Sequence, residues 1–378
     1  MRIGLIAPPW VPVPPVSYGG TETVVDNLAR GLSRLGHEVR LFTLGESTCP
    51  VARSYLFDQA PRVIGTSVEE AAHVFAAYDA LADVDVIHDH TLLGPLLAAA
   101  AHPHHPPVVV THHGVFTAEN RRVFAQIARH AAVLAISHHQ ARHAGPVPVG
   151  AVIHHGIDLE QYRPGVADGE YLLFVGRMSA DKGVHRAIRV ARRSHRQLVI
   201  LAKMREPSEH AYYAQHVQPL LDDDITVLIE PTPEARMDLQ RGAAALINPI
   251  TWPEPFGLVM AEALATATPV IAFGNGAAPE IIDHGRTGYL CRDEDAMVAA
   301  VARLDRIDRA ACREAAERRF SQQRMATDHA RFYRQLSEGV IAPTSQAIPK
   351  ARNHAARGMD LETVRDLPRP RLRKQASR

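Results

Sequence analysis

The chain has 378 residues, more than one hydrophobic core usually serves, so we expect two domains. Its composition is globular, with 46% hydrophobic and 22% charged residues and a formal net charge of +1. The charge is uneven, because residues 339–378 carry nine Lys and Arg against three Asp and Glu, which leaves the rest of the chain at −5. A net negative charge over residues 1–338 does not favour a nucleic-acid partner.

The sequence favours a cytoplasmic protein. Its three cysteines, Cys49, Cys291 and Cys312, are widely spaced and form no Cys-x-x-Cys motif, which suits a reducing compartment. We expect no signal peptide, because the first apolar run soon meets Pro8 and Pro9. We expect no membrane-spanning segment either, because no apolar run approaches ~18 residues.

The first half alternates apolar strands with helices, beginning with a strand over Arg2–Ala7. The spacing of apolar residues predicts a helix over Thr21–Leu35, and Gly36 marks its end. Further strands are predicted at Glu38–Thr43, Val84–His88, Val108–Thr111, Val133–Ile136 and Val149–His154. This β-α-β pattern predicts a doubly wound α/β domain over residues 1–158, followed by a polar linker at 159–169.

A second series of the same kind follows. The predicted strands are Tyr171–Val175, Gln197–Ala202, Ile225–Ile229, Ala244–Ile247 and Pro269–Ala272. The predicted helices are Gly183–Arg193, Tyr212–Leu221, Pro233–Arg241 and Phe256–Ala265. We place this domain at 170–321 and a last helix at 322–337. The remainder, 338–378, is Pro-interrupted and charged, which predicts a disordered basic tail that would favour weak peripheral association with an anionic membrane.

The strongest chemical signal lies in residues 247–265. They read as a strand, a loop and a helix that begins near Pro255, because Pro suits a first helical turn. Glu254 precedes this helix, and Glu262 lies about 12 Å further on at helical rise, so the two carboxylates suit the two ends of one extended ligand. The backbone N–H groups between them form a pocket for an anion, at Phe256, Gly257, Leu258 and Val259.

Two further features suit a phosphate. Gly19 and Gly20, followed by Thr21, lie between the first strand and its helix, where free N–H groups can hold an anion. Arg177 and Lys182 follow the first strand of the second series, at the strand end where doubly wound folds bind ligands. Together these two side chains would neutralise a diphosphate without a metal ion.

The sequence shows no pattern typical of a metal site. Adjacent His112 and His113 follow an apolar strand, but no histidine pair has the helical spacing of a zinc site with a third ligand nearby. Two acidic triplets, at 83–85 and 222–224, lead into predicted strands rather than out of them. That is the end of a doubly wound sheet that does not bind ligands, so we expect no metal cofactor.

Together these motifs resemble those of the retaining glycosyltransferases of family 4. The matching features are the Gly pair at 19–20, the basic pair at 177 and 182, the Glu-x7-Glu segment at 254–262 and the three blocks 268–272, 276–282 and 285–290. The resemblance covers roughly residues 1–337. It implies the GT-B fold, in which two Rossmann-like domains face each other across a cleft. The N-terminal domain would bind an acceptor and the C-terminal domain a nucleotide sugar.

The resemblance also implies residue roles. Glu262 would hold the ribose hydroxyls and Glu254 those of the donor sugar. Arg177, Lys182 and the N–H groups from 256 to 259 would stabilise the leaving diphosphate. A histidine would contact the sugar; alignment to the following Gly selects His113, with the residue before it as the fallback. The implied reaction is transfer of a sugar, and we expect this sugar to be a hexose. The anomeric configuration would be retained, and the departing phosphate would act as the base.

The sequence does not decide three points. The family commonly has Pro-Asn-Gly-Val-Asp where residues 154–158 read His-His-Gly-Ile-Asp, which leaves the part of this loop in acceptor or hinge geometry undecided. The acceptor, whether sugar, lipid or small molecule, and the donor's base and sugar are not identified. The alternative functions are a nucleotide-sugar epimerase or phosphorylase on the same fold and a non-catalytic nucleotide-sugar-binding protein.

Overall fold

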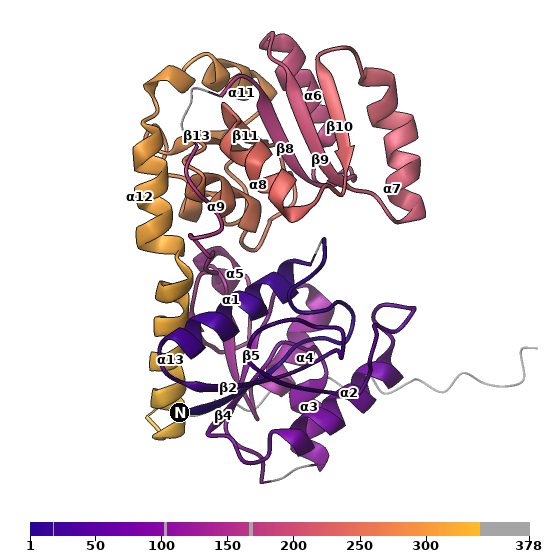
Figure 1. Cartoon of the computed structure of the whole chain (residues 1–378), viewed down its shortest axis with the longest axis vertical. Helices are drawn as coiled ribbons and strands as arrows, with labels where there is room; N and C mark the ends of the chain where they lie inside the picture. The colour runs from indigo at the N-terminus through magenta and orange to yellow at the C-terminus, as the bar shows by residue number, and fades with distance from the viewer. Residues whose placement is uncertain (18, 102–103, 166–168, 341–378) are drawn as a thin grey trace, which may run out of the picture. The chain divides into compact units, whose positions relative to one another are not determined.

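The computed structural model describes residues 1–17, 19–101, 104–165 and 169–340, which form two parallel β-sheets covered by helices (Figure 1). The first sheet has seven strands in the order β3-β2-β1-β4-β5-β6-β7. Its strands are β1 (Arg2–Ile6), β2 (Glu38–Thr43), β3 (Ala52–Tyr55), β4 (Val86–Asp89), β5 (Val108–Thr111), β6 (Ala132–Ala135) and β7 (Val149–Val152). Because neighbouring strands are parallel, their carboxyl ends meet at one edge of the sheet.

Five helices connect these strands: α1 (Gly20–Arg34), α2 (Ser67–Ala80), α3 (Gly94–Ala101), α4 (Ala118–Ile127) and α5 (His138–Arg142). The central strands β4, β5 and β6 are buried along their whole length, as expected for a parallel sheet with helices on both faces.

The second sheet has six strands in the order β10-β9-β8-β11-β12-β13. Its strands are β8 (Leu172–Arg177), β9 (Leu198–Lys203), β10 (Ile225–Ile229), β11 (Ala245–Asn248), β12 (Val270–Phe273) and β13 (Gly288–Cys291). The helices around it are α6 (Val184–Arg193), α7 (Pro207–Tyr212), α8 (Pro233–Arg241), α9 (Leu258–Ala265), α10 (Ala278–Ile281), α11 (Glu294–Val301) and α12 (Arg309–Phe320). The prediction of two Rossmann-like domains is thus confirmed.

Several elements have the predicted bounds, namely β2, β5, β10 and α8. The segment predicted as a helix over Tyr212–Leu221 is helical as far as Leu220, but the helix starts earlier than predicted and is not a regular α-helix throughout. Helix α7 begins earlier, at Pro207, because Glu206 and Glu209 form a capping box around that proline. After Tyr212 the chain continues as a π turn over 213–217 and a 3-10 turn over 218–220. Strands β3 and β13 and helices α10, α11 and α12 were not predicted.

The last helix, α13 (Gln322–Ser337), packs on α1 of the first half (Figure 1). A Cβ added at Gly31 would lie only 2.8 Å from the Cβ of Ala326, so α1 and α13 approach each other closely at this glycine. The predicted apolar members Phe332, Tyr333 and Leu336 are all buried in the core of the first half. The tail predicted beyond this helix lies outside the described residues from 341 onward.

Candidate functional site

A cavity of about 400 Å³ lies between the two halves, and both contribute to its walls. Eleven of the twelve residues selected from the sequence line it: Gly19, Gly20, Thr21, His113, Lys182, Glu254, Phe256, Gly257, Leu258, Val259 and Glu262. Arg177 is not among the described residues that line it. Its guanidinium lies 3.4 Å from the carboxylate of Asp181, and its side chain is 39% exposed.

Two helix N-termini meet at the cavity. Helix α1 begins at Gly20 and α9 at Leu258, and a Cβ added at Gly20 would lie 3.8 Å from Cδ1 of Leu258. The first N–H groups of a helix have no acceptor within it, and its N-terminus carries a partial positive charge. An anion in the cavity would therefore lie near the partial positive charges of both helix N-termini.

The predicted start of α9 near Pro255 is wrong. The helix begins three residues later, because Gly257 takes the left-handed conformation, with φ at 93°, just before it. A side chain at Gly257 would be strained there, and its Cβ would lie 2.5 Å from Cε of Met260. Glu254 consequently stands on a loop and not on the helix that carries Glu262.

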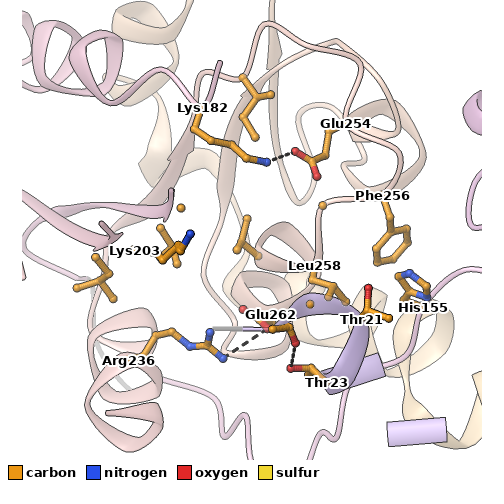
Figure 2. Close-up of a pocket in the computed structure, with 18 of the residues that line it drawn as sticks. Thr21, Thr23, His155, Lys182, Lys203, Arg236, Glu254, Phe256, Leu258 and Glu262 are labelled. Atoms are coloured by element: carbon orange, nitrogen blue, oxygen red, sulfur yellow. Dashed lines mark hydrogen bonds and ion pairs between the residues drawn. The ribbon is translucent and has the colours of Figure 1, made fainter. Parts of the chain in front are cut away.

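Glu254 and Lys182 form an ion pair across one side of the cavity (Figure 2). Both side chains are largely buried, at 17% and 12% exposure. The indole Nε1 of Trp252 donates a second hydrogen bond to Glu254, at 2.9 Å, and the Lys182 ammonium lies 5.1 Å from the centre of the Trp252 ring. The residue predicted to meet the sugar thus holds the residue predicted to meet the diphosphate.

Glu262 lies on the opposite side, with a side chain only 6% exposed. The guanidinium of Arg236 lies 3.7 Å from the Glu262 carboxylate (Figure 2). The side-chain amide of Gln240 donates a hydrogen bond of 3.3 Å to the same carboxylate. Arg236 also donates to the hydroxyl of Tyr162 at 2.9 Å, which fixes the guanidinium against the carboxylate. Arg236 and Lys203 line the cavity and were not selected from the sequence. They stand on α8 and at the end of β9, and no local motif marks them.

The two adjacent histidines lie in different surroundings. His113 lines the cavity, and burial lowers its pKa to about 3. His112 turns away and packs its ring against Phe116 and Phe124, with centroid distances of 4.7 and 4.4 Å. His155, from the loop whose part was undecided, also lines the cavity and contacts Phe256 edge to face.

The same loop forms part of the junction between the halves. The carboxylate of Glu280 accepts hydrogen bonds from the N–H groups of His138 and His139, at 2.8 and 2.6 Å, and from Nε2 of His154 at 2.9 Å. Burial by itself would raise the pKa of Glu280, but these donors outweigh it and lower the pKa to about 2. Gly156 contacts the start of α13, with its N–H 3.0 Å from Sδ of Met325.

Within the part of the chain that the structure describes, no three His, Cys, Asp or Glu side chains are grouped so as to hold a metal ion. The two acidic triplets form ion pairs and cap a turn. Asp83 and Asp85 pair with Arg40 and Arg2 at 2.8 and 3.1 Å, and Asp222 caps its own turn. Among the described helices, none has both the length and the apolar character needed to cross a membrane.

Comparison with known families agrees with this architecture. Residues 18–161 match the model for Glycosyltransferase Family 4, and residues 162–319 match the model for Glycosyl transferases group 1. The two matches follow each other: the first spans β2 to β7 of the first sheet, and the second spans all six strands of the second sheet.

Individual proteins show the same similarity. The chain is 32% identical over 162 residues to a D-inositol 3-phosphate glycosyltransferase of Kribbella flavida, a match that covers 37% of this chain and 38% of that protein. AviGT4, a glycosyltransferase involved in avilamycin A biosynthesis, is 27% identical, with a TM-score of 0.67, over 89% of this chain and 98% of AviGT4.

HepE of Anabaena, solved in complex with UDP-glucose, has a TM-score of 0.72 at 18% identity over 89% of this chain and all of HepE, and it shows a shared fold. Taken with the two Rossmann-like sheets and the cavity between them, the matches show that this chain belongs to the family 4-like, group 1 glycosyltransferases of the GT-B fold.

Proposed function

We propose that this chain transfers a sugar from a nucleotide sugar to an acceptor and retains the configuration of the anomeric carbon. The observation that carries the proposal is the arrangement of charge in the cavity. Two helix N-termini and Lys182 provide the positive potential that a diphosphate needs, and Glu254 and Glu262 lie on either side of it. A nucleotide sugar has this order of groups, with a diphosphate between two hydroxyl-bearing rings.

Each end of the cavity suits one part of the donor. Glu262 is held by Arg236 and Gln240, so its carboxylate is oriented before a ligand enters and would accept hydrogen bonds from the ribose hydroxyls. Glu254 and His113 would meet the donor sugar. Entry of the donor would exchange the Lys182–Glu254 ion pair for two contacts with the ligand, one from Lys182 to the diphosphate and one from Glu254 to a sugar hydroxyl.

The leaving diphosphate would be stabilised by protein groups alone. Lys182 and the first N–H groups of α1 and α9 belong to residues that line the same cavity, and they would meet the charge that develops on the phosphate oxygens. We propose that no divalent metal is required. Arg177 would add its charge only after leaving Asp181, since its guanidinium is directed to that carboxylate in the structure.

We base the retention of anomeric configuration on the resemblance to the retaining family, and we assign no side chain as a nucleophile. We propose attack from the face that the diphosphate leaves, with a phosphate oxygen taking the proton of the acceptor hydroxyl. The donor is a hexose nucleotide in this proposal and the acceptor is bound by the first half. A cytoplasmic location is consistent with Cys49, Cys291 and Cys312, which are free and buried.

A panel of nucleoside diphosphates tests the donor site. A ligand that binds only the folded protein raises the melting temperature, by an amount worth about 2.7 kcal/mol at a hundredfold excess over Kd. One base should stabilise the chain more than the others. The best nucleotide with several sugars is then tested for slow hydrolysis, and proton NMR of the released sugar reports its anomeric configuration.

The outcomes separate a transferase from an epimerase and from a non-catalytic binding protein. Release of nucleoside diphosphate with the α-anomer formed first from an α-linked donor supports a retaining transferase. Interconversion of the donor sugar without nucleotide release indicates an epimerase. Nucleotide binding with neither product indicates a non-catalytic binding protein, and no binding by any nucleotide would contradict the proposal.

A further inference from the structure

The ring of His113, which lines the cavity, contacts the ring of a second histidine, His90. Nε2 of His113 and Nδ1 of His90 are 2.9 Å apart, at hydrogen-bond distance. His90 is 6% exposed, and its ring lies against that of His88, with 4.0 Å between the centroids. The His88 ring is fixed at both nitrogens, to the hydroxyl of Tyr333 at 2.6 Å and to that of Thr111 at 2.8 Å. The pair therefore rests on a rigid support.

The direction of the hydrogen bond between the two imidazoles decides which nitrogen of His113 carries a proton. Burial lowers the pKa of His90 and of His113, so each ring is neutral at physiological pH and has one N–H. Either Nδ1 of His90 donates to Nε2 of His113, or the reverse. In the first case His113 carries its proton on Nδ1, and in the second case on Nε2.

The other nitrogen of His90 distinguishes the two cases. Nε2 of His90 is buried and has no hydrogen-bond partner among the residues that the structure describes. If His113 were the donor, His90 would carry its own proton on this nitrogen and bury an unpaired N–H. If His90 is the donor, the same nitrogen is only an unpaired acceptor. A buried N–H group without an acceptor is rarer in proteins, and costs more free energy, than a buried acceptor nitrogen without a donor.

The same chain contains an internal example of the cheaper arrangement. Nε2 of His73 lies 2.9 Å from the carbonyl oxygen of Ala7, and since a carbonyl only accepts, this nitrogen must carry the proton. Nδ1 of His73 is then an acceptor, and it too is buried without a described partner. An unpaired imidazole lone pair is thus tolerated elsewhere in the first half, which supports the same assignment for His90.

We infer that His90 is a positioning residue, which donates from Nδ1 to Nε2 of His113 and thereby makes Nδ1–H of His113 a hydrogen-bond donor for the ligand in the cavity. The ligand atom that this N–H would meet is an oxygen, either a hydroxyl of the donor sugar or a phosphate oxygen. The tautomer itself is a property of the free protein. Its use in catalysis rests on the proposed function.

The tautomer is measured on the full chain labelled with ¹⁵N-histidine, by two- and three-bond ¹H–¹⁵N correlation at neutral pH. The ring signals of His113 and His90 are assigned by their loss in H113N and H90N. We expect a protonated Nδ1 and an unprotonated Nε2 in both rings. A protonated Nε2 in His113 would overturn the inference, whether or not the protein transfers a sugar.

Two substitutions at His90 test its use. In H90N the side-chain amide can take the place of Nδ1–H and donate to His113, whereas in H90L no donor remains. We expect H90L to mix the tautomers of His113 and to lower kcat about tenfold at an unchanged nucleotide Kd. H90N should keep the Nδ1–H tautomer and stay within about threefold of wild-type kcat.

Other results would contradict the positioning role. An H90L protein with wild-type kcat, or equal losses in H90L and H90N with His113 in its wild-type tautomer in both, would overturn it. Circular-dichroism melting of each variant identifies a loss that comes from unfolding, and in that case the measurement on the wild-type protein decides. If the wild-type protein transfers no sugar, the proposed function fails, while the tautomer is still read from the spectrum.

Discussion

Replacing Glu254 by Gln should lower turnover far more than it changes affinity for a nucleoside diphosphate. In the structure the Glu254 carboxylate accepts hydrogen bonds from Lys182 and from Trp252. Glutamine keeps the shape of the side chain, loses its charge and releases Lys182 for the diphosphate. If releasing Lys182 from this ion pair is worth about 1 kcal/mol, the Kd should stay within about threefold of wild type or tighten by at most about fivefold.

Replacing Glu262 by Gln should have the opposite effect. Its side chain is 6% exposed, and a hydrogen bond from a ribose hydroxyl to a buried carboxylate is worth about 1.5–3 kcal/mol. The Kd for the nucleoside diphosphate should therefore rise about 10- to 150-fold. At a saturating concentration of donor, turnover should change less than this, because the ribose contact is made equally in the ground state and the transition state.

The assay combines calorimetric titration of the nucleoside diphosphate with steady-state kinetics of donor consumption. Glu314→Gln is the matched control, since that carboxylate stands on α12, is 56% exposed and pairs only with Arg286 at 2.8 Å and Arg318 at 3.9 Å among the described residues. Its Kd and turnover should equal those of the wild type. The role assignment is refuted if Glu254→Gln weakens nucleotide binding while turnover is kept, or if Glu262→Gln leaves the Kd unchanged.

Three further predictions concern metal, pH and chain length. Activity should survive excess chelator and fall in Lys182→Ala, and a loss in chelator that magnesium or manganese restores would contradict this. Glu280→Gln should destabilise the protein in urea by about 1.5–3 kcal/mol at pH 7. Because the pKa of Glu280 is depressed from 4.5 to about 2, this difference should be complete above pH 4.5 and shrink as the pH falls toward 2; a difference independent of pH would refute the assignment. Deleting residues 322–378 should lower the melting temperature by several degrees, because Phe332 and Tyr333 each stabilise by about 1.5–3 kcal/mol when buried. Deleting only 340–378 should leave the melting temperature unchanged, and a lower value for this shorter deletion would show that the tail is structural.

Local sequence patterns were sufficient for most of the fold. Buried parallel strands such as β5 read as short apolar runs, and helices such as α8 carry their own start signals, here Thr232 as cap and Pro233 in the first turn. The exposed edge strand β3 lacks such a run, because three of its four residues are exposed and its neighbour is on one side only. The sequence therefore determined which segments form the sheets better than it determined their edges.

The site divides in the same way. Eleven of its residues lie in motifs whose local order is informative, and the structure brings them to one cavity. Lys203 and Arg236 could not be predicted as site residues, because a single basic residue at the end of a strand or on a helix has no local signature. The start of α9 was misplaced because Pro255 gave a plausible first turn, while the left-handed conformation of Gly257 decides the boundary.

Pairing between distant residues is what only the tertiary structure decided. Lys182 meets Glu254, His113 meets His90, and the loop at 154–156 meets Glu280 and the start of α13 across separations of tens to hundreds of residues. Helices are determined locally because their hydrogen bonds join residues four positions apart, and buried strands are recognisable locally as short apolar runs. The partner of a side chain in a cavity depends instead on how two complete domains pack, and that information is spread over the whole chain.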